Sequence, residues 1–223
     1  MNNIIFVAGT DTDVGKTIFS NLYSIYLKEK LNKNVILSKP IQSGCIKDKI
    51  SDLKLYFKLG GAKENSQNSY CLKTPCSIDY ASKIDRVHLN KKKIINDIKK
   101  LSDKYETVVI EGAGGLMSPI KKNYLFVDLI KELNPKIILV SKIILGMINQ
   151  TLLSIELLKK YKLNLTSIVF NKTTIGKIDD KNNESIKSIC NIANVKNHIT
   201  LEYKKNILKN KDYFYNKFKK IKY

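Results

Sequence analysis

The chain has few of the residues that bind zinc or build disulfide frameworks. Its 223 residues include four cysteines without a CxxC pair and only two histidines, His88 and His198. Zinc sites need closely spaced cysteine and histidine ligands, and disulfide scaffolds need many cysteines in a short chain. We therefore expect neither kind of site, and we expect reduced thiols. The cysteines are Cys45, Cys71, Cys76 and Cys190.

Long apolar runs and signal-peptide features are also missing. No stretch of the sequence approaches the roughly 18–20 apolar residues of a membrane-spanning helix. We expect Met1 to Ala8 to form a strand, because no basic region precedes these residues and no cleavage pattern follows them. These features predict a cytoplasmic protein without a membrane partner.

Arginine is almost absent, although the chain is strongly basic. Arg86 is the only arginine, so lysine supplies nearly all of the 40 basic residues behind a net charge of +20. Such a field can attract polyanions, but nucleic-acid interfaces favour the planar, bidentate guanidinium of arginine. Lysine, asparagine, isoleucine and tyrosine also share AT-rich codons, so genome composition explains the excess. We expect a solvated lysine surface and no nucleic-acid partner, with polyanion binding as the lesser alternative.

The length, with 43% hydrophobic and 27% charged residues, fits one globular domain that spans residues 1–223. The order of its segments predicts the α/β class. Short, continuously apolar runs alternate with segments of helical periodicity, which predicts βαβ units in a doubly wound, mostly parallel sheet flanked by helices. The basic tail, 204–223, is either a final helix or loosely ordered. The predicted strands are Ile4–Ala8, Asn34–Ser38, Thr107–Ile110, Lys136–Ser141 and Thr166–Phe170. The predicted helices are Lys16–Lys30, Asp52–Leu59, Lys91–Ser102, Tyr124–Leu133, Met147–Lys160 and Asp180–Ile192.

A glycine-bearing loop joins the first predicted strand to the first predicted helix. It reads GTDTDVGKT from Gly9 to Thr17, in the strand–loop–helix context that a phosphate-binding loop requires. Amides at the helix start would face a phosphate, Lys16 would meet its outer oxygens, and the Thr17 hydroxyl would ligate Mg²⁺. Thr10 stands where the strict motif has glycine, and the alternative is an ordinary turn. The context favours a nucleotide-binding fold of the phosphate-binding-loop NTPase type.

Four segments resemble the dethiobiotin synthetases when taken in order. They are GTDTDVGKT at Gly9–Thr17, KPIQSG at Lys39–Gly44, EGAGG at Glu111–Gly115 and LGMINQ at Leu145–Gln150. Each segment alone is weak, but their joint order is specific. The resemblance implies an ATP-dependent ligase of biotin biosynthesis, which carboxylates 7,8-diaminopelargonate with CO₂ and closes the ring to dethiobiotin, releasing ADP and phosphate.

The resemblance also implies roles for individual residues. Nucleotide binding falls to Asp13, Val14, Gly15, Lys16, Thr17 and Ile18, and contact with the base to Asn171. Stabilisation of the carbamate and of the transferred phosphoryl group falls to Lys16, Lys39, Thr12 and Ser43. Magnesium binding falls to Thr17, Asp52 and Glu111. Binding of the diamine's carboxylate tail, across the interface of a homodimer, falls to Gly146, Met147 and Asn149, alongside Thr12, Lys39 and Ser43 at the reacting end.

Most of these residue types have an ordinary structural alternative. Lys39 could be a surface lysine at a strand end, Thr12 and Ser43 could be turn residues, and Asp52 could be a first-turn acid favoured by the helix dipole. Glu111 is harder to explain in this way, because it ends an apolar strand and a buried carboxylate needs a partner. The proposed reaction needs positioned cations and hydroxyls around anions, which favours the functional interpretation.

The sequence departs from the family pattern in four places, one of them at Lys142, because the family has a lysine nearer the following glycine. Cys76-Ser77-Ile78-Asp79 follows Pro75 where the family has SPH, Gln150 replaces a histidine, and the proline-containing C-terminal loop is not recognisable after Asn197.

Two other functions fit parts of the pattern. A partition or placement ATPase that binds DNA or membrane usually has a lysine where Asp11 stands, and an amide-forming ligase commonly carries an added glutamine-hydrolysing domain.

Overall fold

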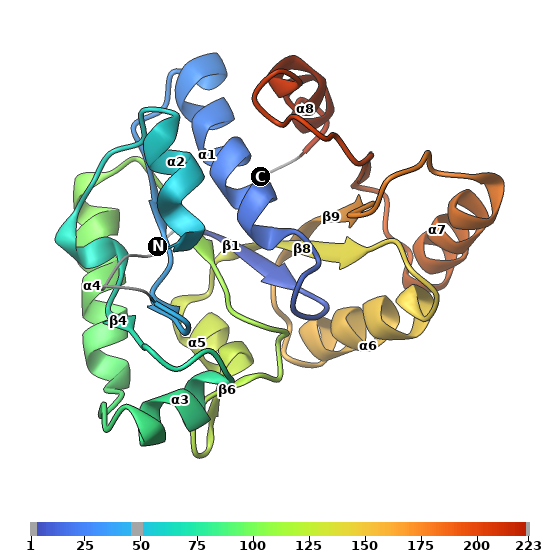
Figure 1. Cartoon of the computed structure of the whole chain (residues 1–223). Coiled ribbons are helices and arrows are strands. Elements are labelled where there is room, and N and C mark those ends of the chain that lie inside the picture. Colours follow the sequence, from blue (N-terminus) through green and yellow to red (C-terminus); the bar gives the residue numbers. More distant parts are fainter. Residues whose placement is uncertain (1–3, 46–50, 222–223) are drawn as a thin grey trace.

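A computed structural model describes residues 4–45 and 51–221, which fold around a six-stranded sheet of order β10-β9-β8-β1-β5-β2. All neighbouring strands in this sheet run parallel. The predicted parallel α/β architecture is therefore confirmed (Figure 1). The strands are β1 (Ile4–Gly9), β2 (Val35–Ser38), β5 (Thr107–Glu111), β8 (Lys136–Lys142), β9 (Leu165–Asn171) and β10 (His198–Leu201).

Both faces of the sheet are covered, which explains why its strands are apolar without alternation. Every residue of β1 is buried. Ile5 and Val7 pack in one cluster with residues of α1, α2 and α8, whereas Ile4, Phe6 and Ala8 pack in a second cluster with residues of α3 to α7. The helices are α1 (Lys16–Leu31), α2 (Lys54–Lys58), α3 (Ile78–Ile84), α4 (Lys91–Lys104), α5 (Phe126–Leu133), α6 (Met147–Lys160), α7 (Asp180–Ala193) and α8 (Lys211–Phe218). Among the residues described, no helix combines the length and apolarity needed to cross a membrane.

Two predicted helices start later than expected, because short local structures precede them. The 3₁₀ turn η1 (Ser51–Leu53) comes before α2, and the strand β7 (Tyr124–Leu125) comes before α5. Strand β7 pairs antiparallel with β6 (Pro119–Lys121), while β3 (Ile41–Gln42) pairs parallel with β4 (Tyr70–Cys71). A second 3₁₀ turn, η2, spans Asn65–Gln67.

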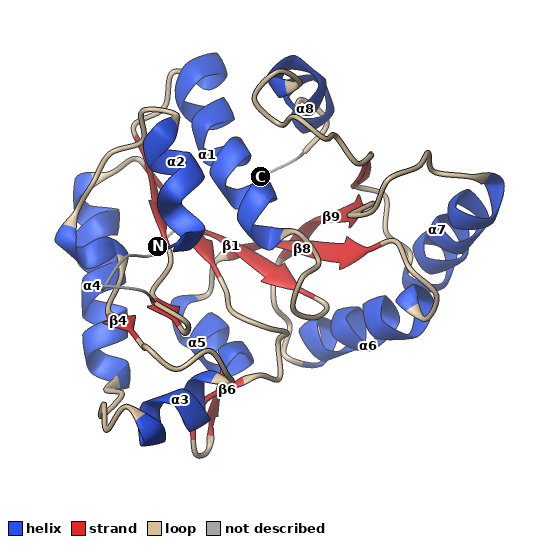
Figure 2. Cartoon of the chain, in the orientation of Figure 1, coloured by secondary structure: helices blue, strands red, loops and turns tan. Residues whose placement is uncertain are grey.

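The basic tail ends in a helix that packs on α1. The Phe218 ring lies 5.4 Å from the ring of Phe19 and 5.5 Å from that of Tyr23, in edge-to-face arrangements that suit aromatic quadrupoles. Figure 2 shows α8 beside α1, on the same side of the sheet. Of the two possibilities for the tail, the structure has the helix.

The expectation of reduced thiols is wrong for one pair. Cys45 and Cys71 form a disulfide, whereas Cys76 and Cys190 are free. The pairing of β3 with β4 places Gln42 opposite Cys71, and the amide of Cys45 donates to the carbonyl of Leu72 at 2.9 Å. These backbone contacts bring the two sulfurs together although their positions are 26 apart in the sequence.

Candidate functional site

A cleft of about 580 Å³ opens where β1, β2, β5 and β9 end. Ligands of open parallel sheets bind at the carboxyl ends of the strands, and the arrowheads of β1, β8 and β9 in Figure 2 point toward this edge. Most of the predicted site residues line the cleft. They are Thr12, Asp13, Gly15, Lys16, Thr17, Ile18, Lys39, Ser43, Asp52, Glu111 and Asn171.

The loop before α1 is shaped by Gly15 and held by Asn171. Gly15 has φ +95°, and a Cβ at this position would lie 2.0 Å from Asn171 Nδ2. That amide donates to the carbonyl oxygen of Val14 at 2.9 Å, while the Val14 side chain is buried. Helix α1 then begins at Lys16 with no acidic residue in its first turn, so its N-terminal amides remain suited to a phosphate.

Lys16 folds back over this loop. Its ammonium donates to the carbonyl of Asp11 at 2.6 Å, and a Cβ on Gly9 would lie 2.7 Å from the same nitrogen. Burial, together with the positive charge of Lys39, lowers the pKa of Lys16 to about 8. An anion bound in the cleft would restore the balance of charge around this ammonium.

Lys39 is a buried cation between two acids. Its side chain is 4% exposed, and its ammonium lies 2.9 Å from Glu111 Oε1 and 2.8 Å from Asp52 Oδ2. It also donates to the carbonyl of Gly112 at 3.0 Å. Burial acts to lower the pKa of Lys39, but Glu111 and Asp52 outweigh it and raise the pKa. Lys39 is therefore a charged residue of the cleft and not a surface lysine.

Glu111 accepts hydrogen bonds from two hydroxyl groups at the start of α1. Its Oε1 accepts a hydrogen bond from Thr17 Oγ1 at 2.7 Å, and its Oε2 accepts one from Ser20 Oγ at 2.8 Å. Asp52 pairs with the same Lys39 ammonium that pairs with Glu111, and its side chain is 27% exposed. In the described part of the chain, no group of three or more acidic, histidine or cysteine side chains is arranged to hold a metal ion. Two carboxylates and a hydroxyl nevertheless fit Mg²⁺, which takes few protein ligands and completes its shell with water and phosphate oxygens.

The remaining predicted residues fall into two groups. Thr12 is exposed in the loop, and Ser43 precedes Gly44, whose φ of +71° turns the chain at the cleft wall. Gly146, Met147 and Asn149 lie at the start of α6, outside the cleft lining, and Met147 is buried. The structure therefore separates the predicted tail-binding residues from the other site residues of the same chain.

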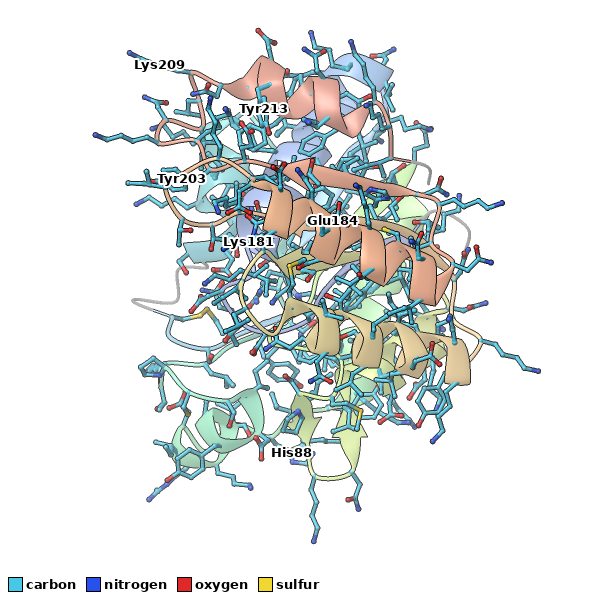
Figure 3. All side chains as sticks on the ribbon, turned by 90° about the vertical axis from the view of Figure 1, so that its right-hand side faces the viewer. His88, Lys181, Glu184, Tyr203, Lys209 and Tyr213 are labelled. Carbon is cyan, nitrogen blue, oxygen red and sulfur yellow. A yellow bond between two sulfur atoms is a disulfide. The ribbon has the colours of Figure 1, made fainter. Side chains whose placement is uncertain are left out.

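One end of the cleft carries no motif that the sequence revealed. It is formed by the segment from the end of β10 to α8, in which Tyr213 OH accepts from the Glu202 amide at 2.9 Å and Lys204 Nζ lies 4.3 Å from the Tyr213 ring centroid. Figure 3 shows Tyr203 and Tyr213 on the same side of the molecule as Lys209, which lies between β10 and α8. The only sequence signal was the aromatic content of the tail. The lining residues from this segment are Glu202, Tyr203, Lys204, Ile207 and Phe214, and Lys172 and Thr173, which follow β9, line the cleft as well.

Curated relatives match nearly the whole chain. The ATP-dependent dethiobiotin synthetase BioD of Clostridium perfringens strain 13 is 36% identical over 205 residues, which cover 87% of this chain and 90% of that protein. The protein of the same name from Methanococcus vannielii is 38% identical over 192 residues, covering 86% and 90%. The chain belongs to the dethiobiotin synthetase family. The profile of the AAA domain family also matches, over residues 3–206. The resemblance found in the four sequence segments is thereby confirmed.

Solved structures with the same fold include an ATPase of another family and a cell division protein. A ParA family ATPase from Chlorobium tepidum aligns with TM-score 0.57 and 9% identity, over 95% of this chain and 89% of that one. The MinD cell division protein of Aquifex aeolicus aligns with TM-score 0.55 and 15% identity, over 96% and 86%. At these identities the likeness shows the fold alone. It therefore gives no support to the partition-ATPase alternative, whereas the dethiobiotin synthetases share the sequence as well.

Proposed function

We propose that this protein is an ATP-dependent dethiobiotin synthetase, a ligase of biotin biosynthesis that forms dethiobiotin from 7,8-diaminopelargonate, CO₂ and ATP. The observation that carries the proposal is the convergence of Lys16, Lys39 and Glu111 in one cleft beside the phosphate loop. The relatives named above support the same activity over most of the chain. We treat residues 1–223 as one nucleotide-binding unit.

The cleft supports nucleotide binding through backbone and side chain together. The amides from Asp13 to Ile18 would surround the triphosphate, and Lys16 would contact its outer oxygens. Asn171, which lies next to Gly15, would contact the base. Thr17, Asp52 and Glu111 would hold Mg²⁺, which when bound neutralises charge on the β- and γ-phosphates. The site thus stabilises anions with cations that are already in position.

The chemistry needs three steps in the remaining part of the cleft. One amine of the diamine adds to CO₂ and loses a proton, giving a carbamate. A carbamate oxygen attacks the γ-phosphorus, and ADP leaves as the mixed anhydride forms. The second amine then attacks the carbonyl carbon, phosphate leaves, and the ring closes with loss of a proton. Lys39 would offset the negative charge of the carbamate and the transferred phosphoryl group, and Thr12 and Ser43 would hydrogen-bond the carbamate oxygens.

We also propose that the enzyme acts as a homodimer. The segment before α6 exposes Ile144 and Leu145, the latter completely, and Ile148 follows on the helix. A second copy would cover this apolar face and bring its own Gly146 and Asn149 to the substrate's carboxylate tail, which explains why they stand outside the cleft of their own chain. We assign no nucleic-acid or membrane partner, and we place this ATP-consuming step in the cytoplasm.

The test is incorporation of carbon-14 from bicarbonate into an acid-stable product by the purified protein. We expect incorporation only when ATP, Mg²⁺ and the diamine are all present, with one ADP formed for each carbon fixed. A folded protein that hydrolyses ATP but fixes no carbon under these conditions would refute the assignment. ATP hydrolysis stimulated by DNA or lipid vesicles would instead support the partition-ATPase alternative.

A further inference from the structure

Asp52 lies on a segment that is poorly fixed by its own secondary structure. It sits in the three-residue turn η1, which leads into the five-residue helix α2. A turn of this length supplies few internal hydrogen bonds. The carboxylate nevertheless reaches Lys39 Nζ at 2.8 Å. Something other than the turn must hold it there.

Asn21 on α1 supplies part of this support. The side chain is completely buried, and its amide nitrogen donates to the carbonyl of Thr17 at 2.6 Å and to that of Asp52 at 2.7 Å. Its amide oxygen accepts a hydrogen bond from the backbone N–H of Tyr56. One proton and the oxygen of this buried side chain thus fasten the η1–α2 segment to α1, and the second proton bonds the Thr17 carbonyl within α1.

Gln42 holds the same segment from the opposite side. Its side-chain nitrogen donates to Ser51 Oγ at 2.5 Å, and its side-chain oxygen accepts from the Asp52 amide at 3.3 Å. Gln42 is also buried and immediately precedes Ser43 at the cleft wall. It lines the cleft itself, so its removal would disturb more than Asp52. Asn21 is the cleaner probe.

We propose that Asn21 is a positioning residue that sets the strength of divalent-cation binding by holding Asp52 beside Thr17. The inference rests on the proposed function, because Thr17, Asp52 and Glu111 form the metal site only if that proposal holds. The physical reason is that the NH₂ group of Asn21 donates to the backbone carbonyls of both Thr17 and Asp52 and so fixes the distance between the backbones of these two proposed ligands. Groups that orient metal ligands in this way typically change metal affinity by roughly 10- to 100-fold when they are removed.

The experiment measures binding of Mn²⁺, which is visible by electron paramagnetic resonance, to the full-length protein with saturating ADP. Asn21→Leu keeps the approximate volume and removes the hydrogen bonds without adding charge. Asp52→Asn weakens the ligand directly. We expect each variant to raise the Mn²⁺ dissociation constant, Asn21→Leu by roughly tenfold or more. In the double variant the two effects should not add, because Asn21 acts through Asp52.

Ser24→Ala is the matched control for stability. Ser24 is buried one turn further along α1 and donates to the carbonyl of Ser20 at 2.7 Å, without contacting Asp52. It should lower the free energy of unfolding and leave Mn²⁺ affinity unchanged. If Asn21→Leu does not fold, Asn21→Ala and Gln42→Met test the same support.

Three outcomes distinguish the possibilities. Weaker Mn²⁺ binding by both single variants, without additivity, supports the proposal. If Asn21→Leu alters only the free energy of unfolding, or if its effect adds fully to that of Asp52→Asn, the positioning role is overturned. If Asp52→Asn leaves Mn²⁺ affinity unchanged, Asp52 has no place in the metal set, and the role of Asn21 falls with it. That last result leaves the carbon-fixing assay as an independent test of the enzyme's identity.

Discussion

The ammonium of Lys39 lies 2.9 Å from Oε1 of Glu111, and neither side chain is more than 4% exposed. Burying two charges is unfavourable unless each satisfies the other, so such a pair is weak support for stability as a whole. Removing one partner, by contrast, leaves an uncompensated charge inside the protein. A pair of this kind at the mouth of a phosphate loop is more readily explained by catalysis than by folding.

The first prediction separates these two effects. Lys39→Met should lower the free energy of unfolding by roughly 3 kcal/mol, because Glu111 loses its cation. Adding Glu111→Gln to Lys39→Met should recover a substantial part of that stability, since both charges are then gone. Dethiobiotin formation should be absent in both variants. Urea unfolding and carbon-14 incorporation measure the two quantities, and a double variant less stable than Lys39→Met would contradict the explanation.

Lys16 should matter for turnover and not for folding. Lys16 is buried and its ammonium donates to a carbonyl oxygen of the loop. Lys16 forms no ion pair among the residues that the structure describes, so Lys16→Ala removes no paired charge. We expect an unchanged thermal unfolding midpoint, weaker ATP binding by calorimetry, and loss of dethiobiotin formation. Lys28→Ala, which removes a lysine that also bonds a backbone carbonyl, that of Gly60, is the matched control. A fully active Lys16→Ala protein would reject the phosphate-loop role.

Gly15→Ala should abolish nucleotide binding for a steric reason. The new Cβ would meet Asn171 Nδ2 at 2.0 Å and would also occupy a residue with φ +95°. Gly60 has φ +82° with no atom within 4 Å of its would-be Cβ. Gly60→Ala should therefore share the backbone strain of about 1–2 kcal/mol but keep ATP affinity. Equal ATP affinity in the two variants, measured by calorimetry, would show that the contact with Asn171 is unimportant.

The sequence predicted the parts of the molecule whose signal is local. Continuous apolar runs such as Ile4–Ala8 identified the parallel strands, because burial on both faces removes alternation. The signal of the phosphate loop is also local, since its glycine and the start of its helix are adjacent in the chain. The start of α6 at Met147 was placed correctly.

What could not be predicted depends on contacts between distant segments. The disulfide of Cys45 and Cys71 requires the pairing of β3 with β4, each only two residues long, and such strands have no periodicity to detect. The support of Asp52 by Asn21 joins positions 31 apart, and Asn21 belongs to no motif. The final helix carries Phe218 on its buried face, but lysines on both sides mask the pattern.

The proposed dimer makes a prediction at Leu145, whose side chain is fully exposed. Leu145→Lys places a charge on an apolar face that a second copy would cover, so it should shift the protein from dimer to monomer in sedimentation velocity. Dethiobiotin formation should fall in parallel, because each substrate tail would lose the partner's α6. Ile175→Lys, on another exposed apolar side chain, should change neither. A wild-type protein that sediments as a monomer at working concentration would contradict the dimer.

The contact between α8 and the Glu29 carboxylate should make the free energy of unfolding depend on pH. Lys211 Nζ donates to Glu29 Oε1 at 2.7 Å and Tyr215 OH to Oε2 at 3.0 Å. Partial burial acts to raise the pKa of Glu29, but these hydrogen bonds outweigh it and lower the pKa. A carboxyl whose pKa is lowered by folding stabilises the protein above its unfolded pKa, about 4.3, and loses that effect as the pH falls through the folded value.

Glu29→Gln should therefore be less stable than the wild type near neutral pH, and the difference should vanish in acid. Because Glu29 is 37% exposed, we expect the difference at pH 7 to be modest, about 1 kcal/mol or less. Urea unfolding from about pH 7 down to pH 3 measures it, spanning the ordinary glutamate pKa. Glu184→Gln removes an ion pair with Lys187 that is 69% exposed on the glutamate side, and its stability difference should be close to zero throughout. A Glu29→Gln difference that persists or grows in acid would mean that the lost stability does not come from the ionised carboxylate, and would contradict this explanation.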